Sequence, residues 1–222
     1  MKRAGRILSV ALITAGVVIL IDAAITLAWQ EPLSAIYANV RQAKAQDQLD
    51  AAEQRFSSDP SVARAKATRD PAKRADQLAS IYAKQISNGQ GIGQIAVPSV
   101  GIDYVLIQGT DTADLQKGPG HYPTSALPGQ GKTIAVAGHR TTYLAPFRDI
   151  ADIKTGDEVT VSMPYGKFTY EVIATDIVDP QDVSVVDDAG RERIVLTACH
   201  PLYSAAQRYV VTAKLTDIEL KP

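Results

Sequence analysis

The chain begins with a long apolar run behind a short basic segment. Residues 1–6 carry three basic side chains, and the 23 residues from 7 to 29 include one charge, Asp22. A helix of that length spans about 34 Å, enough to cross the hydrocarbon core of a bilayer. The run is longer than the apolar part of a signal peptide, so it predicts an uncleaved transmembrane anchor over 7–29. The basic residues predict a cytoplasmic tail over 1–6 and a single-pass topology with the rest of the chain outside the cytoplasm.

Residues 30–89 are more polar and rich in Ala, Gln, Lys, Arg and Asp. Their few large apolar residues, such as Leu78, Ile81 and Tyr82, recur at helical spacing. Asp-Pro pairs at 59–60 and 70–71 interrupt the pattern. The stretch predicts a helical stalk with breaks, outside the cytoplasm, that leads into a folded domain. A partner-binding coiled coil is an alternative, but the apolar heptads are too imperfect to favour it.

From residue 90 onward the pattern changes to short β-rich runs separated by Gly, Pro and Asp turns. Only residues 112–117 and a stretch near 145–150 are typical of helix. Many closely spaced strands in about 130 residues predict a mainly β domain over 90–222, closed or nearly closed into a barrel. The expected strands are Ile92–Val100, Ile102–Gln108, Lys132–Ala137, Asp157–Met163, Lys167–Val178, Arg193–Thr197 and Tyr209–Ile218.

Composition and charge exclude several classes of protein. The 222 residues are 45% apolar and 21% charged, which excludes collagen-like and wholly disordered chains. The net charge of -1 provides no global basic field, so no nucleic-acid partner is expected. The charge is uneven, since the first 89 residues hold 12 basic and 8 acidic groups and the remainder hold 11 and 16. The single cysteine, Cys199, excludes an intramolecular disulfide and a Cys-rich zinc site.

Three residues of complementary chemistry fall at the ends of predicted strands. His139 and Cys199 each come two residues after a predicted run, and Arg208 directly precedes the last run. A thiol attacks as the thiolate, and a nearby imidazole can take its proton. A tetrahedral oxyanion needs a fixed donor, which an always-charged guanidinium supplies. Because strand ends are held rigidly yet reach solvent, the pattern predicts a cysteine nucleophile with an acid–base partner and an oxyanion donor.

These residues also have ordinary structural interpretations. A lone cysteine among apolar neighbours usually packs in a core, and Arg208 could be a surface charge. Because side chains alternate along a strand, His200 is expected to lie on the face opposite Cys199 and to be structural. His121 lies in a turn and is expected to be a structural or subsite-lining residue. Zinc is disfavoured, because adjacent cysteine and histidine ligands fit one ion badly and no ligand pair has the usual spacing. No metal and no cofactor are expected.

Three segments around these residues resemble the sortase family of cysteine transpeptidases. The resemblance covers residues 90–222 and is strongest to the class E, housekeeping-type branch found mainly in actinobacteria. It implies an eight-stranded β-barrel with Cys199 as nucleophile, His139 as general acid and base, and Arg208 as transition-state donor. The segments are Gly118-Pro119-Gly120-His121-Tyr122-Pro123, Ala137-Gly138-His139-Arg140-Thr141-Thr142-Tyr143 and Leu196-Thr197-Ala198-Cys199-His200-Pro201.

The resemblance also implies substrates and a location. Cys199 would cleave the Thr–Gly bond of a Leu-Ala/Pro-x-Thr-Gly sorting signal on a surface protein and form a thioacyl enzyme. An amine of a peptidoglycan precursor (lipid II) would then resolve the thioester and join the protein to the cell wall. The enzyme would be held in the cell membrane with its catalytic domain outside.

Four positions are expected to bind the substrate on this resemblance: Tyr122, Thr141, Tyr143 and Ala198. Tyr122 would lie beside the pocket for the second residue of the signal, where a phenol crowds proline and leaves room for alanine. Ala198 departs from the family, which commonly has threonine before the cysteine. If that hydroxyl binds the oxyanion, losing it would lower the rate by roughly 100-fold.

Other functions stay open at this point. A membrane-tethered peptide-binding module with weak or no activity is faintly favoured by Ala198. A pilin-polymerising sortase would often carry an Asp-Pro-aromatic lid, and the two Asp-Pro pairs here lack the aromatic residue. A protease or L,D-transpeptidase-like enzyme is a further alternative. The L,D-transpeptidase type expects a Gly-Cys-x-Arg arrangement, whereas Arg208 follows Cys199 by nine residues.

Overall fold

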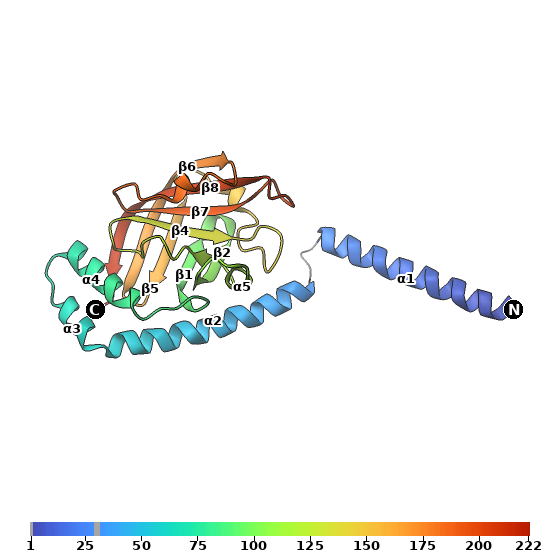
Figure 1. Ribbon diagram of the computed structural model, residues 1–222, viewed down its shortest axis with the longest axis horizontal. Helices are drawn as coiled ribbons and strands as arrows, with labels where there is room; N and C mark the ends of the chain where they lie inside the picture. Colours follow the sequence, from blue (N-terminus) through green and yellow to red (C-terminus); the bar gives the residue numbers. More distant parts are fainter. Residues whose placement is uncertain (1, 29–31) are drawn as a thin grey trace.

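The computed structural model describes residues 2–28 and 32–222, and its eight strands close into a barrel (Figure 1). Neighbouring strands follow the order β1-β2-β3-β4-β7-β8-β6-β5, and β5 pairs with β1 to close the ring. The β2–β3 and β4–β7 pairs are parallel, whereas the other neighbours are antiparallel. The strands are β1 Gly91–Val97, β2 Ile102–Gln108, β3 Gly120–His121, β4 Thr133–Gly138, β5 Glu158–Met163, β6 Gly166–Val178, β7 Arg193–His200 and β8 Gln207–Leu220.

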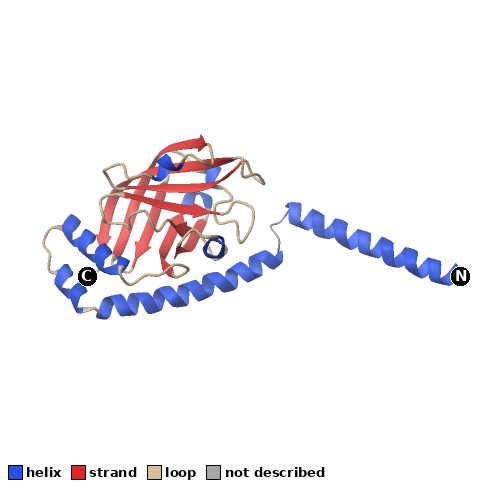
Figure 2. Cartoon of the chain, in the orientation of Figure 1, coloured by secondary structure: helices blue, strands red, loops and turns tan. Residues whose placement is uncertain are grey.

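Helices precede the barrel and short helical turns connect its strands (Figure 2). The eight-stranded barrel with short helices confirms the fold class expected for this part of the chain. The helices are α1 Lys2–Ala28, α2 Pro32–Ser58, α3 Pro60–Lys66, α4 Pro71–Ala83 and α5 Thr112–Leu115, with 3-10 turns at η1 Pro98–Val100, η2 Ile150–Asp152 and η3 Val183–Val186.

Seven strands match the predicted runs to within a few residues, and β3 was not predicted. Gly120–His121 is too short to show alternation, and its glycine is needed because a Cβ there would lie 2.2 Å from the Gly109 carbonyl oxygen. The first strand ends at Val97 instead of Val100. Pro98 has no N–H to donate to the ladder and starts a 3-10 turn.

The helix predicted near 145–150 is wrong, whereas the one predicted from 112 is present as α5. Ala145 has a left-handed φ of 43°. The residue before a proline is disfavoured in the α conformation, and Pro146 follows directly. The chain therefore turns here, and η2 begins only at Ile150.

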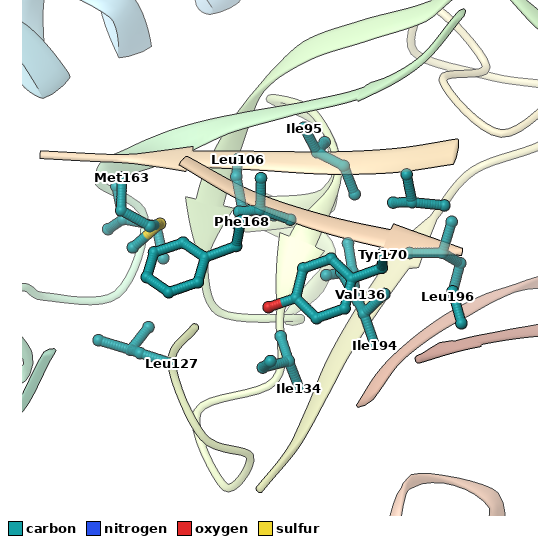
Figure 3. Packing of buried hydrophobic residues seen from close by; sticks show 14 of the residues in the cluster. Ile95, Leu106, Leu127, Ile134, Val136, Met163, Phe168, Tyr170, Ile194 and Leu196 are labelled. Atoms are coloured by element: carbon teal, nitrogen blue, oxygen red, sulfur yellow. The ribbon is translucent and has the colours of Figure 1, made fainter. Parts of the chain in front are cut away.

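Alternate residues of each strand point into the barrel and form its core (Figure 3). Phe168 and Tyr170 of β6 are fully buried, as are Ile194 and Leu196 of β7. Each such side chain stabilises the fold by about 1.5–3 kcal/mol when removed from water. This packed interior holds the strand ends rigidly, which is where the predicted site residues lie.

The helices predicted as a stalk pack against the barrel. Figure 1 shows α2 running along the barrel and α4 lying at the end opposite the tip of β4. Phe56 of α2 and Leu78 and Tyr82 of α4 belong to the main core cluster. The Tyr82 hydroxyl donates to the Ile92 carbonyl at 3.0 Å. Both helices therefore bury apolar side chains against the barrel although residues 30–89 are mainly polar.

The two Asp-Pro interruptions are helix N-caps. Asp59 accepts a hydrogen bond from the Ser61 N–H at 2.8 Å, and Asp70 accepts one from the Ala72 N–H at 2.9 Å. A proline occupies the first turn of each helix, where no N–H is needed. Each pair thus starts a helix, and the first pair also follows directly after the end of α2 at Ser58.

The predicted anchor over 7–29 falls largely within α1. Trp29 and the side chain of Asp22 lie outside the described residues. Within residues 2–28 and 32–222, no helix is long and apolar enough to cross a membrane.

Candidate active site

Three neighbouring strands bring the predicted catalytic residues to one end of the barrel. In the parallel β4–β7 pair Gly138 lies opposite Ala198, so His139 and Cys199 follow side by side. In the antiparallel β7–β8 pair Cys199 lies directly opposite Arg208. Residues separated by about 60 positions in the sequence are thus adjacent through strand pairing alone.

The alternation of β7 decides which of its residues face the site. Ile194, Leu196 and Ala198 belong to the core cluster, so their side chains point into the barrel. Thr197 and Cys199 therefore point outward. Ala198 is only 4% exposed. A hydroxyl at this position would lie on the face opposite the thiol, so the expected loss of an oxyanion donor is not supported.

His139 has the chemical state required of an acid–base group. Burial lowers the pKa of its imidazole below the usual value of about 6.5. The ring is therefore mainly neutral at neutral pH and can accept a proton. Its Nε2 is buried and has no hydrogen-bond partner among the described residues. A buried polar atom without a hydrogen-bond partner destabilises the folded state by about 1–3 kcal/mol. Such atoms are found at catalytic sites, where a substrate or a reacting group supplies the partner.

The local sequence turns the chain sharply after His139. A Cβ on Gly138 would lie 2.5 Å from the ring of Phe147, so only glycine permits this packing. The Phe147 N–H donates to the His139 carbonyl at 2.9 Å and closes the turn. The Ala-Gly-His sequence is thus explained by a fully buried phenylalanine under the strand end.

The loop after His139 has an unusual backbone. Tyr143, Leu144 and Ala145 have φ values of 51°, 68° and 43°, a left-handed run without glycine. Such residues cost about 1–2 kcal/mol each and persist where their surroundings hold them. The Tyr143 ring lies 5.4 Å from the His139 ring between centroids, with planes inclined at 44°. The structure thus brings Tyr143 against His139.

Arg208 lies opposite Cys199, but its guanidinium is bound to its own loop. Its Nη1 donates to the carbonyls of Ala205 and Gln207, each at 3.0 Å. The backbone placement is suitable for a donor beside the thiol. Nε and Nη2 of the same guanidinium carry three further N–H donors that can meet a substrate.

Tyr122 lies on the thiol's side of β7. Its hydroxyl is 3.2 Å from the Thr197 hydroxyl, and Thr197 precedes Cys199 by two residues on the same face. The Tyr122 N–H donates to a β4 carbonyl at 3.0 Å, which fixes the start of the turn. Thr141 is half-buried two residues after His139.

Arg140 is a site residue that the sequence analysis missed. It is 8% exposed, and its Nη1 donates to the Cys199 carbonyl at 3.3 Å while its Nε donates to the Arg148 carbonyl at 3.2 Å. The same Nη1 lies 3.3 Å from Nδ1 of His200. Arg140 thus ties the His139 loop to the backbone of Cys199. Alternation could have suggested this, since the residue after an outward His139 turns inward.

The remaining histidines are structural. His121 is 1% exposed, its Nδ1 lies 2.9 Å from Oε1 of Gln108, and its Nε2 lies 2.9 Å from the Ala126 carbonyl oxygen. The ring of His200 packs against the Tyr209 ring at 5.7 Å, on the inner face, as alternation predicts. Within residues 2–28 and 32–222, no three His, Cys, Asp or Glu side chains gather closely enough to hold a metal ion.

Comparison with known families agrees with this architecture. A family model described as the Sortase domain matches residues 95–216, more than half of the chain. Sortase D of Bacillus subtilis is 34% identical over 143 residues, covering 63% of this chain and 71% of that relative. Sortase A of Bacillus anthracis is 29% identical over 153 residues, covering 68% and 72%.

Solved structures give the same result. Sortase E from Streptomyces avermitilis superposes with a TM-score of 0.56 at 32% identity, covering 62% of this chain and 97% of its own. A Sortase D5 transpeptidase from Clostridium perfringens covers 80% of this chain and 99% of its own with a TM-score of 0.62. At 23% identity that second likeness shows the fold alone. The chain belongs to the sortase family of cysteine transpeptidases.

Proposed function

We propose that this enzyme cleaves a Leu-Ala/Pro-x-Thr-Gly sorting signal on a surface protein between Thr and Gly. It then transfers that surface protein to an amine of a peptidoglycan precursor. The observation that carries this proposal is the meeting of His139, Cys199 and Arg208 through strand register at one barrel end. Class E is the proposed branch, and catalysis outside the cytoplasm, at the cell surface, is part of the same proposal.

Acylation begins when neutral His139 takes the proton of the Cys199 thiol through Nε2. The thiolate attacks the threonine carbonyl carbon, and the guanidinium of Arg208 donates to the oxyanion. As the C–N bond breaks, the imidazolium gives its proton to the leaving glycine amine. The product is a thioester between Cys199 and the threonine, and no cofactor takes part.

Transfer repeats these steps in reverse with a different amine. The incoming amine attacks the thioester carbonyl, His139 takes the proton that the nitrogen loses, and the C–S bond breaks. The thiolate then recovers its proton from the imidazolium. One group thus serves as base and acid in both halves of the reaction.

The direct test is mass spectrometry of the protein mixed with a sorting-signal peptide. We expect an adduct on Cys199 with the mass of the peptide up to its threonine, and release of the glycine-containing fragment. Cys199→Ala is the control and should give neither. Absence of both products from a folded wild-type protein would refute the proposed cleavage.

Substrate preference depends on Tyr122 in this proposal. Its ring beside the thiol face of β7 would narrow the pocket for the second residue of the signal, so alanine is preferred to proline. Pocket shape changes such discrimination by about 1–3 kcal/mol at most. The ratio of kcat/KM for the two peptides should fall toward 1 in Tyr122→Ala. An unchanged ratio in the folded variant would assign Tyr122 to packing of the turn.

A further inference from the structure

The middle of α2 packs closely against the outer face of the barrel. Ala45 and Leu49 form a buried cluster with Val105 and Ile107 of β2. A Cβ on Gly91 of β1 would lie 2.3 Å from the Ala45 carbonyl oxygen, so helix and strand approach as closely as glycine allows. The position of this part of α2 relative to the sheet is therefore fixed by packing.

Gln42 connects α2 to the edge of β2 that the two-residue β3 leaves uncovered. Its Oε1 accepts the Val105 N–H at 2.8 Å, and its Nε2 donates to the Val105 carbonyl at 3.2 Å. The same Nε2 also donates to the Lys117 carbonyl, just after α5. The helix is thus joined to the segment that follows α5.

A chain of contacts continues from this helix to His139. Nη1 of Arg41 donates to Oε1 of Gln116 at 2.9 Å, and Nε2 of Gln116 donates to the Tyr143 hydroxyl oxygen at 3.3 Å. The Tyr143 ring packs against the His139 ring. A series of contacts therefore links α2, the end of α5 and the loop after His139, which are far apart in the sequence.

Arg41 determines how the Gln116 amide and the Tyr143 hydroxyl are oriented. A guanidinium can only donate, so the Gln116 amide must turn its oxygen toward Arg41 and its NH2 toward Tyr143. The Tyr143 oxygen then accepts, and its hydroxyl hydrogen is available for another acceptor. A backbone carbonyl of a bound peptide has the matching chemistry.

We propose that Arg41 and Gln116 are positioning residues of the active site, which hold Tyr143 against His139 and direct its hydroxyl toward the peptide. This inference rests on the proposed transpeptidase function. The left-handed run that starts at Tyr143 is not a conformation that its residues prefer, so contacts from outside the loop must hold it. The contact with Gln116 comes from outside the loop, and α2 anchors it.

Substitution should slow the reaction without unfolding the barrel. We expect Gln116→Leu to lower kcat/KM by about tenfold, mainly through kcat, since small displacements of a catalytic group are costly. Arg41→Met should have a smaller effect in the same direction, and Arg41→Lys should restore part of it. Arg55→Met is the matched control, because Arg55 is an exposed arginine of the same helix outside this chain of contacts. It should leave kcat/KM unchanged.

Gln116→Glu separates position from hydrogen bonding. A carboxylate still accepts from Arg41, but it also accepts the Tyr143 hydroxyl hydrogen. That hydrogen is then withdrawn from the peptide, so KM should rise several-fold while the ring of Tyr143 stays in place.

A second readout is independent of turnover. The Cε1–H proton resonance of His139, assigned by its loss in His139→Ala, senses the ring current of Tyr143. It should move in Gln116→Leu and Arg41→Met toward its position in Tyr143→Leu, and stay in Gln116→Glu and Arg55→Met. A double-mutant cycle of Gln116→Leu with Tyr143→Leu should be non-additive in kcat/KM.

Normal kcat/KM in Gln116→Leu, or a loss with an unmoved His139 resonance and an additive cycle, would overturn the positioning role. A wild-type protein that never forms the Cys199 adduct would instead refute the transpeptidase function, and the His139 resonance would still report whether Arg41 and Gln116 hold Tyr143.

Discussion

The turn around His121 and the loop around His139 each hold a buried histidine, but the two imidazoles differ in their hydrogen bonding. Burial lowers the pKa of both imidazoles, that of His121 to about 4. The His121 ring has polar partners at both nitrogens, including the Ser125 hydroxyl at 3.1 Å from Nε2. Nε2 of His139 is buried without a partner among the described residues.

The comparison teaches that burial and a lowered pKa do not identify a catalytic histidine. His121 is the more buried of the two, and its polar atoms are satisfied, as those of a structural residue usually are. The unpaired nitrogen of His139, next to Cys199 in the strand register, is the feature that indicates chemistry. Four experiments test this difference between the two histidines.

Removing His139 should have the largest effect. General acid–base catalysis contributes about 10²–10⁴-fold, so His139→Ala should lower kcat/KM by at least about 100-fold. Its Tm should change little, because the ring lacks hydrogen bonds at Nε2. A peptide-cleavage assay and thermal unfolding measure the two effects. Near-normal turnover in His139→Ala would remove its assigned role.

His121 should instead control stability as the pH falls. Its pKa is about 4 in the folded state and about 6.5 when unfolded, so the unfolded chain binds the extra proton between these values. The contribution of neutral His121 to the free energy of unfolding is fully present above about pH 6.5. About 3 kcal/mol of it is lost as the pH falls toward 4. Urea unfolding across this window should show a much smaller loss in His121→Asn. Equal losses in both proteins would mean that His121 is not the titrating group.

The glycine before His139 should tolerate no side chain. Gly138→Ala forces its methyl into the Phe147 ring, and overpacking of this kind costs about 1–3 kcal/mol. Activity should fall as well, because the His139 loop is displaced. Phe147→Leu in the same chain should recover part of both losses. If Gly138→Ala alone is as stable and active as wild type, the close packing has no importance.

Arg140 should have the smallest effect of the four. Arg140→Met removes its hydrogen bond to the Cys199 carbonyl, and we expect kcat/KM to fall by about tenfold. Arg140→Lys keeps a donor and should recover part of the rate. The kcat and KM values of both variants, compared with their Tm, separate positioning from folding. A loss of Tm with unchanged kcat would make Arg140 purely structural.

Much of the fold could be predicted from local patterns. Alternation located seven strands, and the residues that follow or precede three of them included His139, Cys199 and Arg208. β3 was missed because two residues show no period, and the helix expected near 145–150 was wrong because Pro146 and the buried Phe147 override its propensity. The helical segments of 30–89 were predicted, but their packing on the barrel was not.

Strand period and turn chemistry are local properties, so most elements could be predicted from the sequence, and the motifs around its single cysteine predicted the family. The direction of each side chain and the contacts between distant segments depend on the tertiary structure. It placed Ala198 inside the barrel, Arg140 in a hydrogen bond with the Cys199 carbonyl, and Arg41 beside Gln116. These relations depend on barrel closure and helix packing, which join residues far apart in the chain, such as Arg41 and Gln116 at 75 positions, and leave no periodic signal.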